Sequence, residues 1–264
     1  MTTVLLHGLG ADRRQPLTLF ESVVQDVCGA DEVVVAPDVR AHGGFLAVGE
    51  PEDFAMDRLA AEVCEVVPAA MADAGHGARA ASEPVTIIGI SMGAAIALRI
   101  ALLGLLPIAR AVFVRPAFDD RSLPEHLRPF PVIGQILADA GPAGVAEFQE
   151  RAIYQRVEAE SPAGGRALLA QFQAPDAARR AMRLVEIPRN RAFDAEGDLA
   201  ELGARGIRSF VVGAVRDPVH PVAVAEQWAG ALRTPMELVP GRDDGLAAHT
   251  AALQERVARW LSRD

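Results

Sequence analysis

The chain contains no lysine, and all 26 of its basic residues are arginine. Chemistry that needs a lysine ammonium group is therefore excluded. This removes Schiff-base catalysis, attachment of pyridoxal phosphate and the phosphate-binding Gly-Lys-Ser/Thr loop from the possible functions.

Cysteines and clusters of basic residues are also scarce. The two cysteines, Cys28 and Cys64, lie inside amphipathic helical patterns, so we expect reduced core residues and no disulfide. No metal-ligand spacing is present. A net charge of −9 over 264 residues, with no basic cluster, argues against a nucleic-acid partner.

Long hydrophobic runs that would span a membrane are lacking as well. The N-terminus has no basic segment before its short apolar run, so no signal peptide is expected. The apolar stretch 85–109 is interrupted at its centre by Gly-Ile-Ser-Met-Gly, which favours a buried strand followed by a helix. We expect a cytoplasmic protein that does not associate with membranes.

Six short apolar segments are present and predict buried strands. Their hydrophobicity is continuous, which is typical of parallel strands covered on both faces. The predicted strands are Thr3–Leu6, Glu32–Ala36, Val85–Ile90, Ala111–Val114, Ser209–Val212 and Met236–Val239. Helical patterns alternate with them, which predicts an α/β fold with a doubly wound, mostly parallel sheet of about six strands.

The strand signal disappears between residues 119 and 206. This stretch contains helical patterns at 143–158 and 177–186 and is broken by seven prolines. We therefore predict a core made of residues 1–118 and 207–264, with a helical lid inserted at 119–206.

The sequence "PVTIIGISMGAAIAL", residues 84–98, places Ser91 in a Gly-x-Ser-x-Gly motif between a predicted strand and a predicted helix. A nucleophilic serine at such a corner adopts a strained backbone, and the residues two positions before and after it must be very small. Gly89 and Gly93 meet this requirement. The alternative, a buried turn that simply needs small residues, does not explain the strand-to-helix context.

With these motifs the chain resembles the α/β-hydrolase-fold family over nearly its whole length. Residues 7–10 ("HGLG") are similar to the family's oxyanion loop, residues 37–43 ("PDVRAHG") to its Asp-x-Arg-Gly-His-Gly segment, and residues 211–221 ("VVGAVRDPVHP") to its acid-bearing turn. The chain starts directly at the family's third strand, so the usual first hairpin is expected to be absent or shortened.

The resemblance implies a catalytic triad of Ser91, Asp217 and His249, in the family's chain order. His249 follows the last predicted strand, whereas His220 is only three residues past Asp217, too close in sequence to be presented easily by it. Should His249 lie out of reach of Ser91, His220 becomes the candidate base, and Asp119 or Asp120 must be reconsidered as the acid.

The remaining histidines are expected to have other roles. His7 and His42 belong to backbone-shaping motifs, His76 to a surface turn and His126 to the lid.

Further residues are expected around the triad. The backbone amides of Leu9 and Met92 should form the oxyanion hole. Arg115 either binds a substrate carboxylate or pairs with Asp119 or Asp120. Phe118 lines an apolar substrate pocket or belongs to the lid core, and the same alternatives hold for Phe130, Phe148 and Phe172.

Two loops contain acidic residues with predicted structural roles. Asp38 should fix its own loop, with Arg40 as a candidate partner. Asp243 and Asp244 are expected to be solvated loop charges.

The sequence therefore predicts a serine hydrolase that cleaves a small-molecule ester, thioester or lactone through an acyl-enzyme, without cofactor or metal. Two alternatives stay open: a ligand-binding sensor on the same fold, and an acyltransferase or lyase that keeps the triad. Nothing in the sequence indicates the oligomeric state.

Overall fold

A computed structural model describes residues 2–72 and 83–263, and these contain one parallel sheet of six strands with the spatial order β2-β1-β3-β4-β5-β6. All five strand pairs are parallel. The strands are β1 (Thr2–Leu6), β2 (Val33–Val35), β3 (Val85–Ile90), β4 (Ile108–Val114), β5 (Arg208–Ala214) and β6 (Met236–Val239). The predicted α/β fold and its six strands are confirmed.

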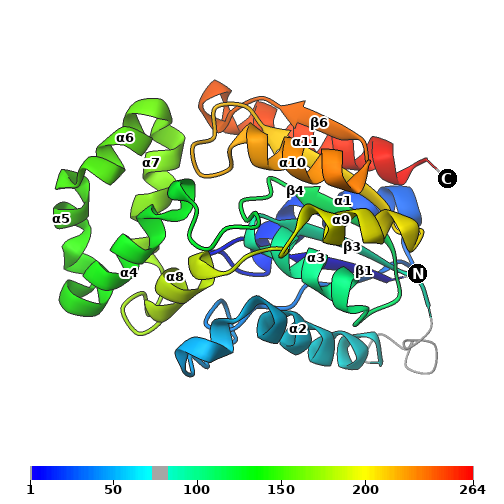
Figure 1. The fold of residues 1–264 in the computed structure, drawn as a ribbon, viewed down its shortest axis with the longest axis horizontal. Helices are drawn as coiled ribbons and strands as arrows, with labels where there is room; N and C mark the ends of the chain where they lie inside the picture. The colour runs from blue at the N-terminus through cyan, green and yellow to red at the C-terminus, as the bar shows by residue number, and fades with distance from the viewer. Residues whose placement is uncertain (1, 73–82, 264) are drawn as a thin grey trace.

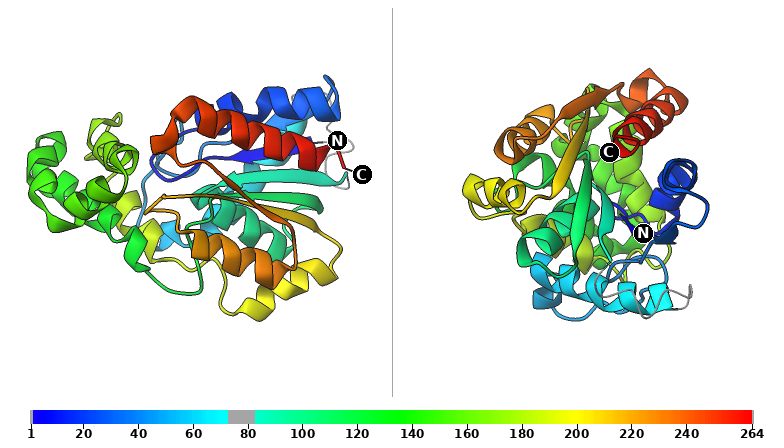
Figure 2. Two further views of the ribbon diagram at one scale, coloured as in Figure 1. Left: turned by 90° about the horizontal axis from the view of Figure 1, so that it is seen from above. Right: turned by 90° about the vertical axis from the view of Figure 1, so that its right-hand side faces the viewer.

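Helices cover both faces of this sheet (Figures 1 and 2). α1 (Arg14–Cys28) and α11 (Leu246–Leu261) pack together on one face. The opposite face carries α2 (Met56–Met71), α3 (Met92–Leu103), α9 (Glu196–Ala204) and α10 (Val222–Leu232).

Two hydrophobic cores result, because successive strand residues point to opposite faces. In β3, Ile87 packs with α2 and α3, whereas Ile88 packs with α1 and α11. In β4, Phe113 belongs to the core on the side of α2 and α3, and Val112 belongs to the core on the side of α1 and α11. The continuous hydrophobicity of these strands thus reflects burial on both sides.

A separate helical layer lies at one end of the sheet (Figure 1). It contains α4 (Pro129–Ala140), α5 (Val145–Glu150), α6 (Ala152–Glu160), α7 (Pro162–Leu169) and α8 (Met182–Glu186). Prolines stand at the first position of α4 and α7, where the missing N–H costs nothing.

The structure refines the predicted insertion at three points. The helix expected over 143–158 is divided at Arg151, whose backbone is extended, and the helix expected over 177–186 is restricted to α8. α9 belongs to the predicted segment 119–206, yet it packs against α3 and α10 of the core. The layer over the sheet end therefore stops before α9, and the division into core and lid remains a proposal.

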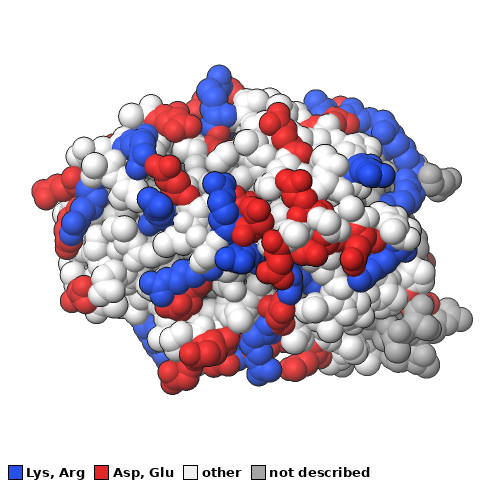
Figure 3. Space-filling model, in the orientation of Figure 1, with Lys and Arg blue, Asp and Glu red and all other residues white. Residues whose placement is uncertain are grey.

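The face shown in Figure 3 carries both acidic and basic side chains, and among the described residues neither sign covers the whole of it. Within residues 2–72 and 83–263, none of the helices has the length and apolar character needed to cross a membrane.

Candidate active site

Ser91 lies at the corner between β3 and α3, with φ of 54° and ψ of −111°. The glycines on either side are required by close backbone approach. A Cβ on Gly89 would come within 2.2 Å of the Gly93 carbonyl oxygen, and one on Gly93 within 2.5 Å of the Leu6 carbonyl oxygen. The predicted strained corner is thus present, and it leaves Ser91 partly exposed.

The side chain of Ser91 contacts His220. Its Oγ lies 2.9 Å from Nε2 of His220, and Nδ1 of His220 lies 3.0 Å from Oδ2 of Asp217. The second contact has the length of a hydrogen bond but imperfect alignment, as is common for catalytic contacts before substrate binds. Ser91, His220 and Asp217 therefore form a continuous chain of contacts.

A tight turn brings Asp217 and His220 together although they are only three residues apart. Oδ1 of Asp217 accepts hydrogen bonds from the amides of Val219 and His220, both at 3.2 Å, and the carbonyl of Asp217 accepts from the His220 amide at 3.1 Å. This Asx-type turn folds the chain back, so that Oδ2 faces the imidazole. The short spacing in sequence argues against His220 in an extended chain, but in this turn it brings the two side chains together.

His249 does not take the predicted place beside Ser91, and this is a correction. It lies in the first turn of α11, is buried, and its Nδ1 donates to the carbonyl of Pro240 at 2.7 Å. The loop after β6 forms a short 3₁₀ helix, η7 (Arg242–Asp244), before α11 begins. The geometry therefore gives Ser91 a different histidine partner, His220.

The rival acid Asp119 is engaged elsewhere. Its Oδ1 accepts from the amide of Arg121 at 2.8 Å, and its Oδ2 accepts from the Arg121 guanidinium. The carboxylate that contacts His220 is that of Asp217, and Asp119 does not take part in this chain of contacts.

The other described histidines support loops. His7 accepts from the amide of Val39, and His42 accepts from the amide of Gly10, both at 3.0 Å through Nε2. His126 donates from Nε2 to the carbonyl of Ala117. His76 lies outside the described residues.

Two arginines share Oδ2 of Asp217 with His220. Nη1 of Arg115 lies 3.3 Å from this oxygen, and Nη2 of Arg242 lies 3.7 Å from it. Burial alone would raise the pKa of Asp217, but His220 and the two arginines outweigh burial and hold it far below its usual range. The carboxylate stays ionised.

The pKa of His220 is lowered from its ordinary value of 6.5. Burial is the main cause; Asp217 opposes it, and the positive charges of Arg115 and Arg242 act in the same direction as burial. A neutral imidazole at neutral pH can accept the proton of Ser91.

The loop at residues 7–10 is fixed around one free amide. The Gly8 amide donates to Oε1 of Gln15 at 2.8 Å, and the Gly10 amide donates to His42. For the Leu9 amide between them, the described part of the chain offers no partner. Met92 is the first residue of α3, so its amide has no acceptor within the helix. Both amides are available for an oxyanion.

Ser91 opens into a pocket of about 240 Å³, called the serine pocket below. Gly8, Leu9 and His220 line it from the core side. Phe130 of α4 and Leu168 of α7 line it from the helical layer at the end of the sheet, called the lid layer below. Phe118 lines it too, whereas Phe148 and Phe172 pack on each other in the lid core at 5.6 Å between ring centroids. The predicted apolar lining thus applies to Phe118 and Phe130.

Arg115 and Arg242 also line the serine pocket. Arg115 was expected to pair with Asp119 or Asp120 if it did not bind substrate, and its ion pair is instead with Asp217. No sequence pattern pointed to Arg242, because its contribution depends on how η7 folds back toward Asp217.

Two further loop predictions are refined. Asp38 does fix its own loop, but its side-chain partner is Arg13, with Nε at 2.8 Å, while Arg40 pairs with Glu62. Asp243 is exposed, as predicted, and it also accepts hydrogen bonds from the Ser161 hydroxyl and the Ala163 amide at the start of α7. It therefore ties the lid layer to the loop that carries Arg242.

No group of three or more His, Cys, Asp or Glu side chains in the described ranges is arranged to hold a metal ion. The site can do chemistry with its own groups: a hydroxyl next to an imidazole, a carboxylate behind it, and two unpartnered amides in front.

Comparison with known proteins places the chain in a family. No curated protein matches the chain. Among solved structures, MenH from S. aureus is similar with a TM-score of 0.67 at 15% identity, covering 99% of this chain and 93% of that one. An enol-lactonase from Burkholderia xenovorans LB400 (TM-score 0.63, 20% identity, 99% and 91% covered) is also similar.

A thermophilic esterase from Thermogutta terrifontis has a TM-score of 0.63 at 19% identity, with 99% of this chain and 88% of that one covered. At these identities the likeness concerns the fold. The model of the Alpha/beta hydrolase family matches residues 3–260. The chain belongs to the alpha/beta hydrolase family.

Proposed function

We propose that the protein is a serine hydrolase that cleaves a small-molecule carboxylic ester, thioester or lactone through an acyl-enzyme. The observation that carries the proposal is the contact of Ser91 Oγ with His220 Nε2 at 2.9 Å, on a strained corner facing a pocket. An activated hydroxyl in such a place is the requirement for nucleophilic acyl transfer.

The proposed reaction proceeds in two halves. Ser91 Oγ attacks the acyl carbon while its proton passes to Nε2 of His220, and Asp217 stabilises the imidazolium that forms. The amides of Leu9 and Met92 bind the developing oxyanion. The imidazolium then protonates the leaving oxygen or sulfur, and a water activated by His220 releases the acid from Ser91.

An acyl-enzyme should be visible as a burst. Mixing the protein with excess 4-nitrophenyl acetate should release about one equivalent of 4-nitrophenol per chain, followed by a slower steady rate if deacylation is slower than acylation. Because the serine pocket holds only about 240 Å³, 4-nitrophenyl octanoate should be turned over more slowly than the acetate.

The same assay separates the alternatives. If the protein is an acyltransferase, adding a primary alcohol should increase the steady rate, and the main product should be the ester of that alcohol. If it is a hydrolase, the main product should be the free acid. A ligand-binding sensor would give neither a burst nor turnover, and that result would contradict the proposal.

The pH dependence of the reaction should report the lowered pKa of His220. Protonation of His220 removes the base, so kcat/KM for 4-nitrophenyl acetate should fall as pH decreases through a pKa below 6.5. Arg242→Gln removes one cation near the imidazole, which should raise the pKa of His220. The fall in kcat/KM should then occur at higher pH in this variant.

Arg216→Gln provides the matched control. Arg216 lies next to Asp217 in sequence, but its side chain is 58% exposed and pairs with Asp244. Its replacement should leave the low-pH fall in kcat/KM at the same pH, since an exposed charge is screened. The electrostatic account would be ruled out if kcat/KM of the unmodified protein fell through a pKa at or above 6.5, or if both variants showed the same shift.

A further inference from the structure

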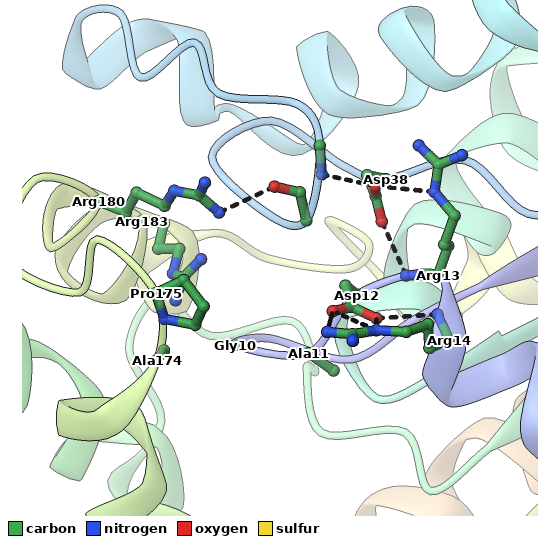
Figure 4. A pocket seen from close by; sticks show the side chains of 12 residues that line it. Gly10, Ala11, Asp12, Arg13, Arg14, Asp38, Ala174, Pro175, Arg180 and Arg183 are labelled. Atoms are coloured by element: carbon green, nitrogen blue, oxygen red, sulfur yellow. Dashed lines mark hydrogen bonds and ion pairs between the residues drawn. The ribbon is translucent and has the colours of Figure 1, made fainter.

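A second pocket, of about 410 Å³, lies beside the serine pocket and is called the arginine pocket here (Figure 4). Gly10 and Ala11 line both pockets, so the two are separated by the loop that carries Leu9. The arginine pocket is lined by Gly10, Ala11, Asp12, Arg13, Arg14, Asp38, Gly43, Gly44, Ala174, Pro175, Arg180 and Arg183.

Arg183 is the unusual residue of this pocket. It is only 3% exposed, and its guanidinium donates from Nη1 to the carbonyl of Ala41, while its Nε has no partner. Within the described residues no carboxylate lies at ion-pair distance from it. A buried guanidinium without a counter-ion is costly, and a bound anion would remove this cost.

Its charged neighbour increases the cost. Arg180 is 5% exposed and donates to the carbonyl of Gly43 at 3.1 Å, and its one ion-pair partner in the described part of the chain is the half-exposed Asp176, at 3.5 Å. Burial, together with repulsion from Arg180, lowers the pKa of Arg183 to about 10, so Arg183 remains charged at neutral pH.

The two carboxylates in the lining are already engaged. Asp12 is held by the Arg14 guanidinium, with Nη2 at 2.6 Å, and Asp38 is held by Arg13 and by the amides of Arg13 and Gly44. Figure 4 shows these pairs on the side of the pocket opposite Arg180 and Arg183. Neither carboxylate neutralises the two buried arginines.

The N-terminus of α1 also lies at this pocket, but its first amides are engaged. The helix begins at Arg14, whose amide donates to Oδ1 of Asp12 at 2.9 Å, and the Arg13 amide donates to Oδ1 of Asp38 at 2.7 Å. The attraction for an anion therefore comes from the buried arginines, because guanidinium groups match the oxygens of phosphate and carboxylate.

We propose that the arginine pocket is a binding site for a phosphate or carboxylate group, with Arg183 and Arg180 as its main ligands. The anionic group belongs either to a free small anion or to the distal end of a substrate whose ester lies in the serine pocket. The second case rests on the proposed function. Such a substrate would extend from one pocket to the other past Gly10, which lines both pockets, and Gln171, which lines the serine pocket.

Thermal unfolding tests the site itself. At matched ionic strength, potassium phosphate or malonate should raise the Tm of the unmodified protein by about 3 °C more than potassium chloride, at roughly ten times the dissociation constant. Arg183→Met and Arg180→Met should each lose this difference. Arg156→Met, an exposed arginine paired with Glu125, should keep it in full.

No anion-specific rise in the unmodified protein, or an equal rise in Arg183→Met and Arg180→Met, would overturn the proposal. If one of these variants does not fold, the other still decides. These measurements do not depend on catalysis, so their outcome is independent of whether the proposed hydrolase activity is found.

Kinetics distinguish the two sources of the anion. If the group is part of the substrate, Arg183→Met should raise KM at least tenfold for mono-4-nitrophenyl glutarate and leave KM for 4-nitrophenyl butyrate unchanged. If both KM values stay the same while phosphate still stabilises the unmodified protein, the site binds a free anion. Absence of turnover with either ester contradicts the hydrolase proposal alone.

Discussion

Replacing His220 by alanine should lower kcat for 4-nitrophenyl acetate by about 10⁴-fold or more, with a much smaller effect on KM. The reason is that His220 Nε2 contacts Ser91 Oγ in the structure, and the proton transfer it performs is completed only in the transition state. Steady-state kinetics of the purified variant, compared with its circular dichroism spectrum, measure this effect directly.

His249→Ala is the matched comparison, because His249 is the other histidine near this group of charges. Its Nδ1 contacts a backbone carbonyl at the end of β6, so its removal should cost some stability and less than about tenfold in kcat. The assignment would be reversed if His249→Ala lost four orders of magnitude and His220→Ala did not. The two variants together decide which histidine is the base.

The fold was accessible from the sequence because its signals are local. Val85–Ile90 is apolar throughout since both faces of β3 are covered, and the prediction has the same bounds as the strand. Gly89 and Gly93 are needed by contacts within the β3–α3 corner itself. In such cases the residues that cause a feature lie within it, so the sequence around them is sufficient.

The histidine that we propose as the base was not accessible in this way. Its selection depends on an Asx-type turn at Asp217 and on the path of the loop between β6 and α11, and both place side chains through backbone geometry. The sequence "DPVHP" contained the signal, since Asp and Pro favour turns. A three-residue spacing keeps two side chains apart in an extended segment, whereas in a turn it brings them face to face.

The charges around the site were the least predictable part. Arg242 and Arg183 come from the η7 loop and the lid layer, far in sequence from the residues they approach, and neither belongs to a motif. Asp243 likewise meets Ser161 across the boundary between core and lid. Buried ion pairs and unpartnered charges arise from tertiary packing, and a single sequence carries little information about them.

Ser91→Ala should reduce kcat by about 10⁶-fold, the scale typical for loss of a nucleophile that acts as one unit with its base. A fluorophosphonate probe should label the unmodified protein at Ser91, and the variant should stay unlabelled. Labelling at another serine, or turnover retained in the variant, would remove Ser91 from the mechanism.

Ser91→Gly sharpens this test by separating strain from chemistry. Ser91 has a φ of 54°, which a residue with a Cβ adopts at a cost of about 1–3 kcal/mol and glycine adopts freely. Both variants lack the nucleophile, but Ser91→Gly should have a Tm about 2 °C or more above that of Ser91→Ala, because the strain relieved exceeds the about 0.5–1 kcal/mol that the added backbone freedom of glycine costs. A higher Tm for Ser91→Gly than for the unmodified protein, together with loss of labelling, would indicate that the corner sacrifices stability to hold a reactive serine. A Tm for Ser91→Gly below that of Ser91→Ala would mean that the corner is not strained.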